Sequence, residues 1–147
     1  MIHWTLLAFD ELTPRELYRI LQLRNEVFVV EQQCLFQDAD DKDPFAYHLM
    51  GWKEGNLVAY SRLLAPGISY TEMSIGRVVT APGVRRTGIG RDLMARSIES
   101  GRHLFGPGPI RIGAQCYLID FYSSLGFRPE GTPYLEDGIE HIEMVLP

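Results

Sequence analysis

Hydrophobic positions along the chain follow two periods, and each period predicts a different kind of element. Apolar runs of strand length predict β-strands at residues 2–9, 48–52, 57–64, 70–80, 110–114, 128–135 and 139–146. Apolar residues at helical spacing predict helices at residues 14–28, 91–104 and 118–125. The order of strand, helix, meander, helix, strand, helix and hairpin predicts an α/β (α+β) fold with a mixed, mostly antiparallel central sheet flanked by helices.

Turn and cap residues mark the ends of several predicted elements. Thr13-Pro14-Arg15-Glu16 combines a capping box with proline at the first helical position. Lys53-Glu54-Gly55-Asn56 and Glu136-Asp137-Gly138 have the composition of hairpin turns, so their flanking strands are expected to be antiparallel neighbours. Gly106-Pro107-Gly108-Pro109 must end the second helix.

Length and composition predict one domain over residues 1–147, since the chain has 147 residues of which 46% are hydrophobic. Fourteen basic against nineteen acidic residues give a net charge of −5, which disfavours a nucleic-acid partner. The chain begins without a basic leader and has no apolar run of bilayer length, so we expect a soluble cytoplasmic protein without a membrane partner. Cys34 and Cys116 lack zinc-ligand spacing and are expected to be reduced thiols, with a disulfide as the alternative.

The segment Arg85-Arg86-Thr87-Gly88-Ile89-Gly90 lies between a predicted strand and a predicted helix. Glycines let the backbone approach a ligand, and a helix start offers free N–H groups to an anion, so this segment predicts a phosphate cradle. A Walker A loop would need Lys after Gly88, and a dinucleotide fingerprint would need glycine where Leu93 stands. The remaining alternative is a plain glycine-rich connector.

Three arginines and an acidic run are harder to assign. Arg24 lies on an apolar helical stripe, where it either pairs with a carboxylate such as Glu31 or has a role in a site. Arg62 and Arg77, on meander strands, either satisfy interior acids or anchor a substrate carboxylate. The aspartates of residues 38–43 have the pattern of a solvated loop. The histidines have no spacing typical of a metal site, and none is predicted.

Four motifs in order resemble the GNAT superfamily of N-acetyltransferases, in its small ElaA-like branch. The segment 85–90 matches the pattern Arg/Gln-x-x-Gly-x-Gly/Ala of the acetyl-coenzyme A loop, and Tyr122 to Phe127 resembles the Tyr-x-x-x-Gly-Phe signature. The segments 23–32 and 136–142 resemble the ElaA-like branch. This resemblance implies a splayed strand pair that holds acetyl-CoA.

The resemblance also implies roles for individual residues. Backbone groups of Val78, Val79 and Thr80 would polarise the thioester carbonyl. Tyr122 would protonate the departing thiolate, with core packing as the rival interpretation of its apolar position. Gln115 would place a polar group against the cofactor. The pyrophosphate would be surrounded by the loop and helix start, namely Arg85, Arg86, Thr87, Gly88, Ile89, Gly90 and Arg91.

The sequence does not single out one residue as the general base. His141 is a candidate because an imidazole has an intrinsic pKa near neutrality, and its strand position faces away from Ile142 and Met144. Glu31 follows an apolar run and would have a raised pKa if desolvated. A chain of water molecules is the third option.

These observations predict an acetyl-CoA-dependent N-acetyltransferase acting on a primary amine of a small molecule or protein. The acidic excess predicts a cationic acceptor, attracted by the aspartates of residues 38–43 and by Glu136 and Asp137. One alternative is a non-catalytic acyl-CoA sensor or interaction domain on the same fold. Another is a thiol hydrolase using Cys116 with His141, although no oxyanion-hole motif accompanies the cysteine. The oligomeric state is left open, with a homodimer among the options.

Overall fold

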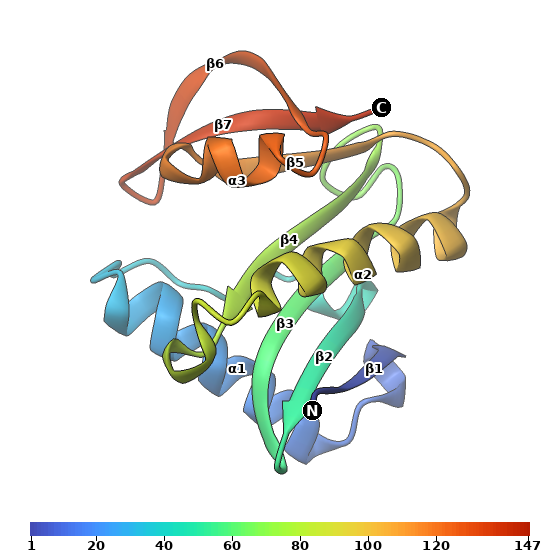
Figure 1. Cartoon of the computed structure of the whole chain (residues 1–147), viewed down its shortest axis with the longest axis vertical. Helices are drawn as coiled ribbons and strands as arrows, with labels where there is room; N and C mark the ends of the chain where they lie inside the picture. The colour runs from blue at the N-terminus through green and yellow to red at the C-terminus, as the bar shows by residue number, and fades with distance from the viewer.

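A computed structural model describes residues 1–147 and contains one seven-stranded sheet in the order β1-β2-β3-β4-β5-β7-β6 (Figure 1). Every neighbouring pair is antiparallel except β4 and β5, which are parallel. The expected mixed, mostly antiparallel sheet is therefore confirmed. The strands are β1 (His3–Ala8), β2 (Tyr47–Lys53), β3 (Asn56–Leu64), β4 (Met73–Thr80), β5 (Ile110–Gln115), β6 (Arg128–Glu136) and β7 (Ile139–Leu146).

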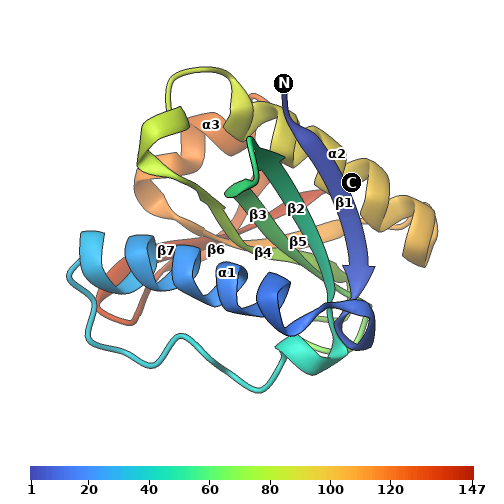
Figure 2. The ribbon, with the colours of Figure 1, turned by 90° about the horizontal axis from the view of Figure 1, so that it is seen from below.

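Helices α1 (Pro14–Arg24) and α2 (Ile89–Phe105) cover opposite faces of the sheet (Figure 2). Helix α3 (Ile119–Ser123) is a short helix that packs on β5 and β6. Single turns connect the larger elements: η1 (Phe9–Glu11), η3 (Asp43–Phe45), η4 (Pro82–Val84) and η5 (Cys116–Leu118). No helix is long and apolar enough to cross a membrane.

The start of α1 confirms the predicted capping box. The Glu16 N–H donates to Thr13 Oγ1 at 3.1 Å, and the Thr13 N–H donates to Glu16 Oε1 at 2.8 Å. At its other end α1 continues as a π-helix, η2 (Asn25–Glu31), which the apolar pattern did not predict. π-Helical turns are rare and occur often at functional sites. This turn brings the end of η2 toward the C-terminal half of the sheet, where Gln32 contacts Gln115.

Both faces of the central strands are packed. Strand β3 is buried from Leu57 to Leu64, since α1 covers one side of it and α2 the other. The largest core cluster lies between α2, α3 and the strands β3, β4, β5 and β7 and includes Met94, Phe127 and Met144. Strand β4 is buried from Met73 to Ile75, whereas most of its C-terminal half is half-buried.

Candidate active site

Strands β4 and β5 run parallel but pair over only two positions. Met73 pairs with Ile110 and Ser74 with Arg111, and no further pairs follow. Strand β5 instead keeps its full ladder to β7, from Ile110 to Gln115. From Ile75 to Thr80, the β5-side edge of β4 is therefore left without a partner strand, and its backbone groups are available to a ligand that adds to this edge.

The predicted phosphate cradle forms the N-terminus of α2. Gly88 is the N-cap residue, with φ 83° and ψ 2°, and no side chain caps the helix. The first-turn N–H groups of an uncapped helix are free to bind an anion. A Cβ at Gly88 or Gly90 would meet no atom within 4 Å, so neither glycine is required by packing within the chain. Gly88 is needed for its left-handed backbone, and both positions leave room for a close ligand.

Basic side chains surround this helix start. Arg86 and Arg91 are exposed, and Arg91 contacts Ser124 Oγ at 3.2 Å. The Ile89 side chain is buried in the core, so only its backbone faces the loop. The Thr87 hydroxyl donates to the Val84 carbonyl and closes the loop on itself. An uncapped helix start, two open glycines and exposed guanidinium groups fit a pyrophosphate.

Arg85 is engaged by Glu31. Its Nη1 and Nη2 atoms donate to Glu31 Oε2 and Oε1, each at 2.6 Å. The hydrogen bonds from Arg85 hold the pKa of the Glu31 carboxyl below its usual range. The condition for a raised Glu31 pKa, desolvation of the carboxyl, is therefore not met, because the side chain is exposed and paired with a cation. Glu31 is also not the partner of Arg24.

Tyr122 combines a buried ring with a free hydroxyl. The side chain is 6% exposed and packs against Phe121 and Phe127, with ring centroids 5.1 and 5.9 Å away. Its hydroxyl makes no hydrogen bond within the chain, and the oxygen keeps some exposure to solvent. Burial raises the pKa of Tyr122 to about 12. The ring belongs to the core, as the rival interpretation held, while the hydroxyl stays protonated and available as a proton donor.

His141 and Gln115 are paired across β7 and β5 at the end of β5. The Gln115 Nε2 atom donates to Gln32 Oε1 at 3.3 Å, so the end of η2 reaches this point. His141 is 6% exposed, and its Nδ1 lies 2.7 Å from the Ile139 carbonyl oxygen. A carbonyl only accepts, so Nδ1 carries the proton and Nε2 keeps its lone pair. Sequence reasoning missed Gln32, whose only signal was its place beside Glu31 in the motif of residues 23–32.

Val78, Val79 and Thr80 form the C-terminal end of β4, as expected. Val79 is 4% exposed and packs with the α1 side of the core, while Val78 and Thr80 are half-buried. Cys116 lies at the end of β5, where desolvation and Glu140 raise the pKa of its thiol. A nucleophilic cysteine needs a lowered pKa, and the ring of His141 bonds elsewhere, so the geometry disfavours a thiol hydrolase.

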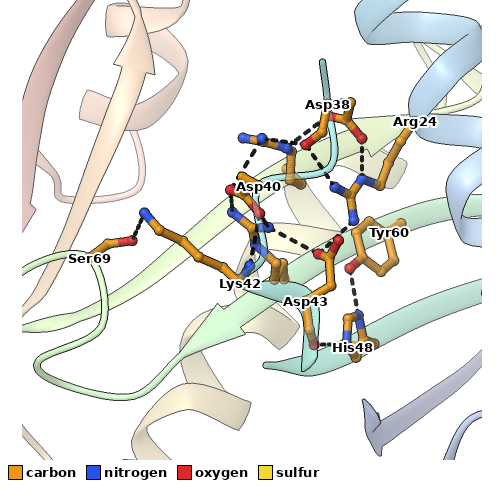
Figure 3. A network of polar contacts seen from close by, with 10 residues as sticks. Arg24, Asp38, Asp40, Lys42, Asp43, His48, Tyr60 and Ser69 are labelled. Carbon is orange, nitrogen blue, oxygen red and sulfur yellow. Dashed lines mark hydrogen bonds and ion pairs between the residues drawn. The ribbon is translucent and has the colours of Figure 1, made fainter. Parts of the chain in front are cut away.

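The acidic loop of residues 38–43 is not a solvated face but the partner of all three unexplained arginines (Figure 3). Arg24, fully buried, donates to Asp38 Oδ2 at 2.7 Å and to Asp43 Oδ1 at 2.8 Å. Arg62 donates to both oxygens of Asp40, at 2.7 and 2.8 Å. The expectation that Asp38 and Asp40 attract a cationic acceptor is therefore wrong, because buried arginines already neutralise them.

The ion pairs keep the loop carboxylates charged, and two residues behind the loop add further hydrogen bonds. Burial alone would raise the pKa of the Asp40 carboxyl, but the hydrogen bonds and charge of Arg62 outweigh it and hold that pKa well below its usual range. His48 Nε2 lies 3.1 Å from the Asp43 carbonyl oxygen, and Nδ1 lies 2.6 Å from the Tyr60 hydroxyl. The carbonyl fixes the tautomer, so His48 accepts from Tyr60. These hydrogen bonds attach the loop to strands β2 and β3.

Comparisons with known proteins agree with this geometry. The family model described as an acetyltransferase (GNAT) domain matches residues 14–147. The chain is 42% identical to Protein ElaA of Escherichia coli over 146 residues, which cover 98% of this chain and 95% of that protein. The crystal structure of E. coli ElaA superposes with a TM-score of 0.93 over 100% of both chains.

A second solved structure is similar at the same level. It is an acyl-CoA N-acyltransferase from Pseudomonas aeruginosa, 41% identical, with a TM-score of 0.96 over 100% of both chains. The resemblance found in the sequence is thus confirmed over nearly the whole chain. The chain belongs to the GNAT acetyltransferase family, whose members use acyl-coenzyme A.

Proposed function

We propose that the protein transfers an acetyl group from acetyl-CoA to a primary amine, by direct attack of the amine on the thioester. The observation that carries this proposal is the uncapped N-terminus of α2, with its two open glycines, beside the unpaired edge of β4. An anion-binding helix start next to a free strand edge suits a ligand with a pyrophosphate and an amide-bearing arm.

The bound acetyl-CoA would supply an activated acetyl group as a thioester. The backbone N–H groups at the start of α2 would hold its pyrophosphate, with Arg86 and Arg91 adding charge. Backbone groups of Val78, Val79 and Thr80 would align the arm and polarise the carbonyl, since preorganised donors act strongly where charge develops. The C-terminal ends of β4 and β5 are unpaired with each other and leave an opening between them. Gln115 and Gln32 would line the β5 side of this opening.

Tyr122 would donate the proton that the departing thiolate needs. Its raised pKa keeps the phenol protonated at all ordinary pH values, and its hydroxyl has no competing partner in the chain. A donor that is free in the resting protein and bonded as the thiolate leaves stabilises the transition state selectively.

His141 is the base that we propose for the amine proton. The Nδ1–H is held by the Ile139 carbonyl, which orients the ring and leaves Nε2 to accept. Glu136 Oε2 lies 3.5 Å from Nε2 and would stabilise the imidazolium after proton transfer. Glu31 is the weaker choice, since Arg85 lowers its pKa and occupies both of its oxygens.

The test combines binding with turnover. Acetyl-CoA at about 100 times its dissociation constant should stabilise the fold by roughly 2.7 kcal/mol. Release of free thiol would then be followed across a panel of primary amines at fixed acetyl-CoA. Binding with thiol release supports the enzyme, whereas binding without release from any amine would favour the non-catalytic acyl-CoA sensor. No stabilisation by millimolar acetyl-CoA would reject both.

A further inference from the structure

Strand β4 contains a bulge at Arg77. Tyr60 pairs with Val79 and Arg62 pairs with Gly76, so Ser61 alone faces both Arg77 and Val78. Two residues opposite one define a β-bulge, whose first residue is often a glycine in a left-handed conformation. Here that residue is Arg77, with φ of 49°.

The neighbouring glycine does not take this conformation. Gly76 has no positive φ, although only a glycine adopts one without steric cost. An arginine in the left-handed region persists only where its surroundings hold it there. The side chain of Arg77 makes such contacts, all of them with the loop of residues 38–43.

The guanidinium of Arg77 is held by the loop of residues 38–43. Its Nη2 atom donates to the Asp38 carbonyl oxygen at 2.9 Å and to Asp40 Oδ2 at 3.3 Å. Its Nε atom lies 2.9 Å from Asp38 Oδ1. The two aspartates are themselves fixed by the buried side chains of Arg24 and Arg62. Figure 3 shows Asp38, Asp40 and Asp43 of this loop within one network of polar contacts, so the carboxylates that contact Arg77 also have other partners.

The bulge lies directly before the backbone that would face the thioester. Arg77 and Val78 share one planar peptide, so the conformation of Arg77 sets the direction of that peptide and of the strand that follows. The loop that provides the anchor begins a few residues after Gln32, which borders the opening at Gln115. The network therefore links the loop of residues 38–43 to the C-terminal half of β4.

We propose that Arg77 is a positioning residue: the Asp38 and Asp40 contacts hold it in the left-handed conformation, and the bulge thereby orients the backbone of Val78 and Val79 toward the thioester. The catalytic part rests on the proposed function. The anchoring part concerns the structure of β4 alone and can be tested separately.

The test compares Arg77→Gly with Arg77→Ala. Glycine keeps the left-handed backbone without a side chain, whereas alanine loses the anchor and retains the steric penalty. We expect kcat to fall by about tenfold or more in Arg77→Ala and to stay within about threefold of wild type in Arg77→Gly. The KM for acetyl-CoA should change less than kcat in either variant, because the start of α2, which would hold the pyrophosphate, is a separate segment from the bulge. Asp38→Asn should lower kcat in the same direction as Arg77→Ala, by a smaller factor.

Amide NMR spectra provide a readout that needs no turnover. The Val78 and Val79 amide signals should move in Arg77→Ala and remain near their wild-type positions in Arg77→Gly. Equal loss of kcat in both variants would overturn the proposal, since the guanidinium itself would then act on the substrate. Unchanged kcat in both would assign Arg77 to stability alone, and unmoved signals in Arg77→Ala would reject the anchoring role. If the wild type acetylates no amine, the proposed function fails while the NMR comparison still decides the anchoring role.

Discussion

Arg85 and Glu31 face each other as a forked ion pair, with both nitrogen–oxygen distances at 2.6 Å. Glu31 is the last residue of η2, and Arg85 lies in the loop before α2. A pyrophosphate at that loop would compete with Glu31 for the same guanidinium. The pair therefore opposes binding of the cofactor that we propose.

Glu31→Gln should tighten acetyl-CoA binding, because Arg85 is then free to pair with phosphate oxygens. The gain should be roughly two- to fivefold, the range expected for an exposed ion pair. Isothermal calorimetry at low salt would measure it. Glu99→Gln removes a negative charge from an exposed position without an ion pair and should leave the affinity unchanged. Equal affinities of wild type and Glu31→Gln would contradict competition for Arg85.

Gly88→Ala should weaken acetyl-CoA binding at least tenfold and destabilise the fold by about 1 to 2 kcal/mol, since a Cβ is unfavourable at φ 83°. The matched control is Gly83→Ala in η4, where φ is not positive and a Cβ meets no atom within 4 Å. Thermal melting with and without acetyl-CoA separates the two effects. A full ligand-induced shift in Gly88→Ala would show that the left-handed N-cap is not required.

Tyr122→Phe should lower kcat while acetyl-CoA affinity stays nearly intact, because the proton is needed only as the thiolate departs. The hydroxyl has no partner in the chain, so the free energy of unfolding should change by less than about 0.5 kcal/mol. Tyr117→Phe, at an exposed neighbouring position, is the control. If Tyr122→Phe turned over at the wild-type rate under conditions where the chemical step limits the rate, Tyr122 would have a packing role only.

His141→Ala should flatten the acidic limb of the plot of kcat/KM against pH. A histidine base would place that limb between about pH 5 and 8. Glu31→Gln should leave that limb in place, since its carboxylate is already engaged by Arg85. Activity of the wild type should rise further toward alkaline pH, because an acceptor amine with a pKa near 10 must lose its proton. An unchanged limb in His141→Ala would indicate a water chain.

Asp40→Asn should reduce the free energy of unfolding by about 3 kcal/mol at pH 7, because Arg62 loses its bidentate partner in a largely buried network. The folded-state pKa of Asp40 is lowered, so its stabilisation is present above the unfolded value of about 3.9 and is lost as pH falls through the folded value. The difference between wild type and variant should therefore shrink in acid. Urea unfolding from pH 7 to 3 tests this, with Asp41→Asn, exposed in the same loop, as control.

The sequence by itself determined most of the helices and strands and the glycine-containing loop before α2. Local signals were sufficient there, because the Thr13 capping box, the hairpin turns and the glycines of residues 85–90 act within a few residues of one another. Strand β4 begins at Met73 rather than Tyr70, a small difference at an element end, where local signals are weakest. A glycine at position 88 suits the left-handed backbone that the structure has there.

Only the tertiary structure decided which charges meet. Arg24 is paired with Asp38 and Asp43, fourteen and nineteen residues away, and Glu31 with Arg85, fifty-four residues away. Separation along the chain does not predict such distances in space, so the carboxylate partner of each arginine could not be chosen from the sequence. Arg77 illustrates the same limit: its left-handed backbone next to Gly76 has no sequence signal, because it depends on contacts with a loop nearly forty residues earlier.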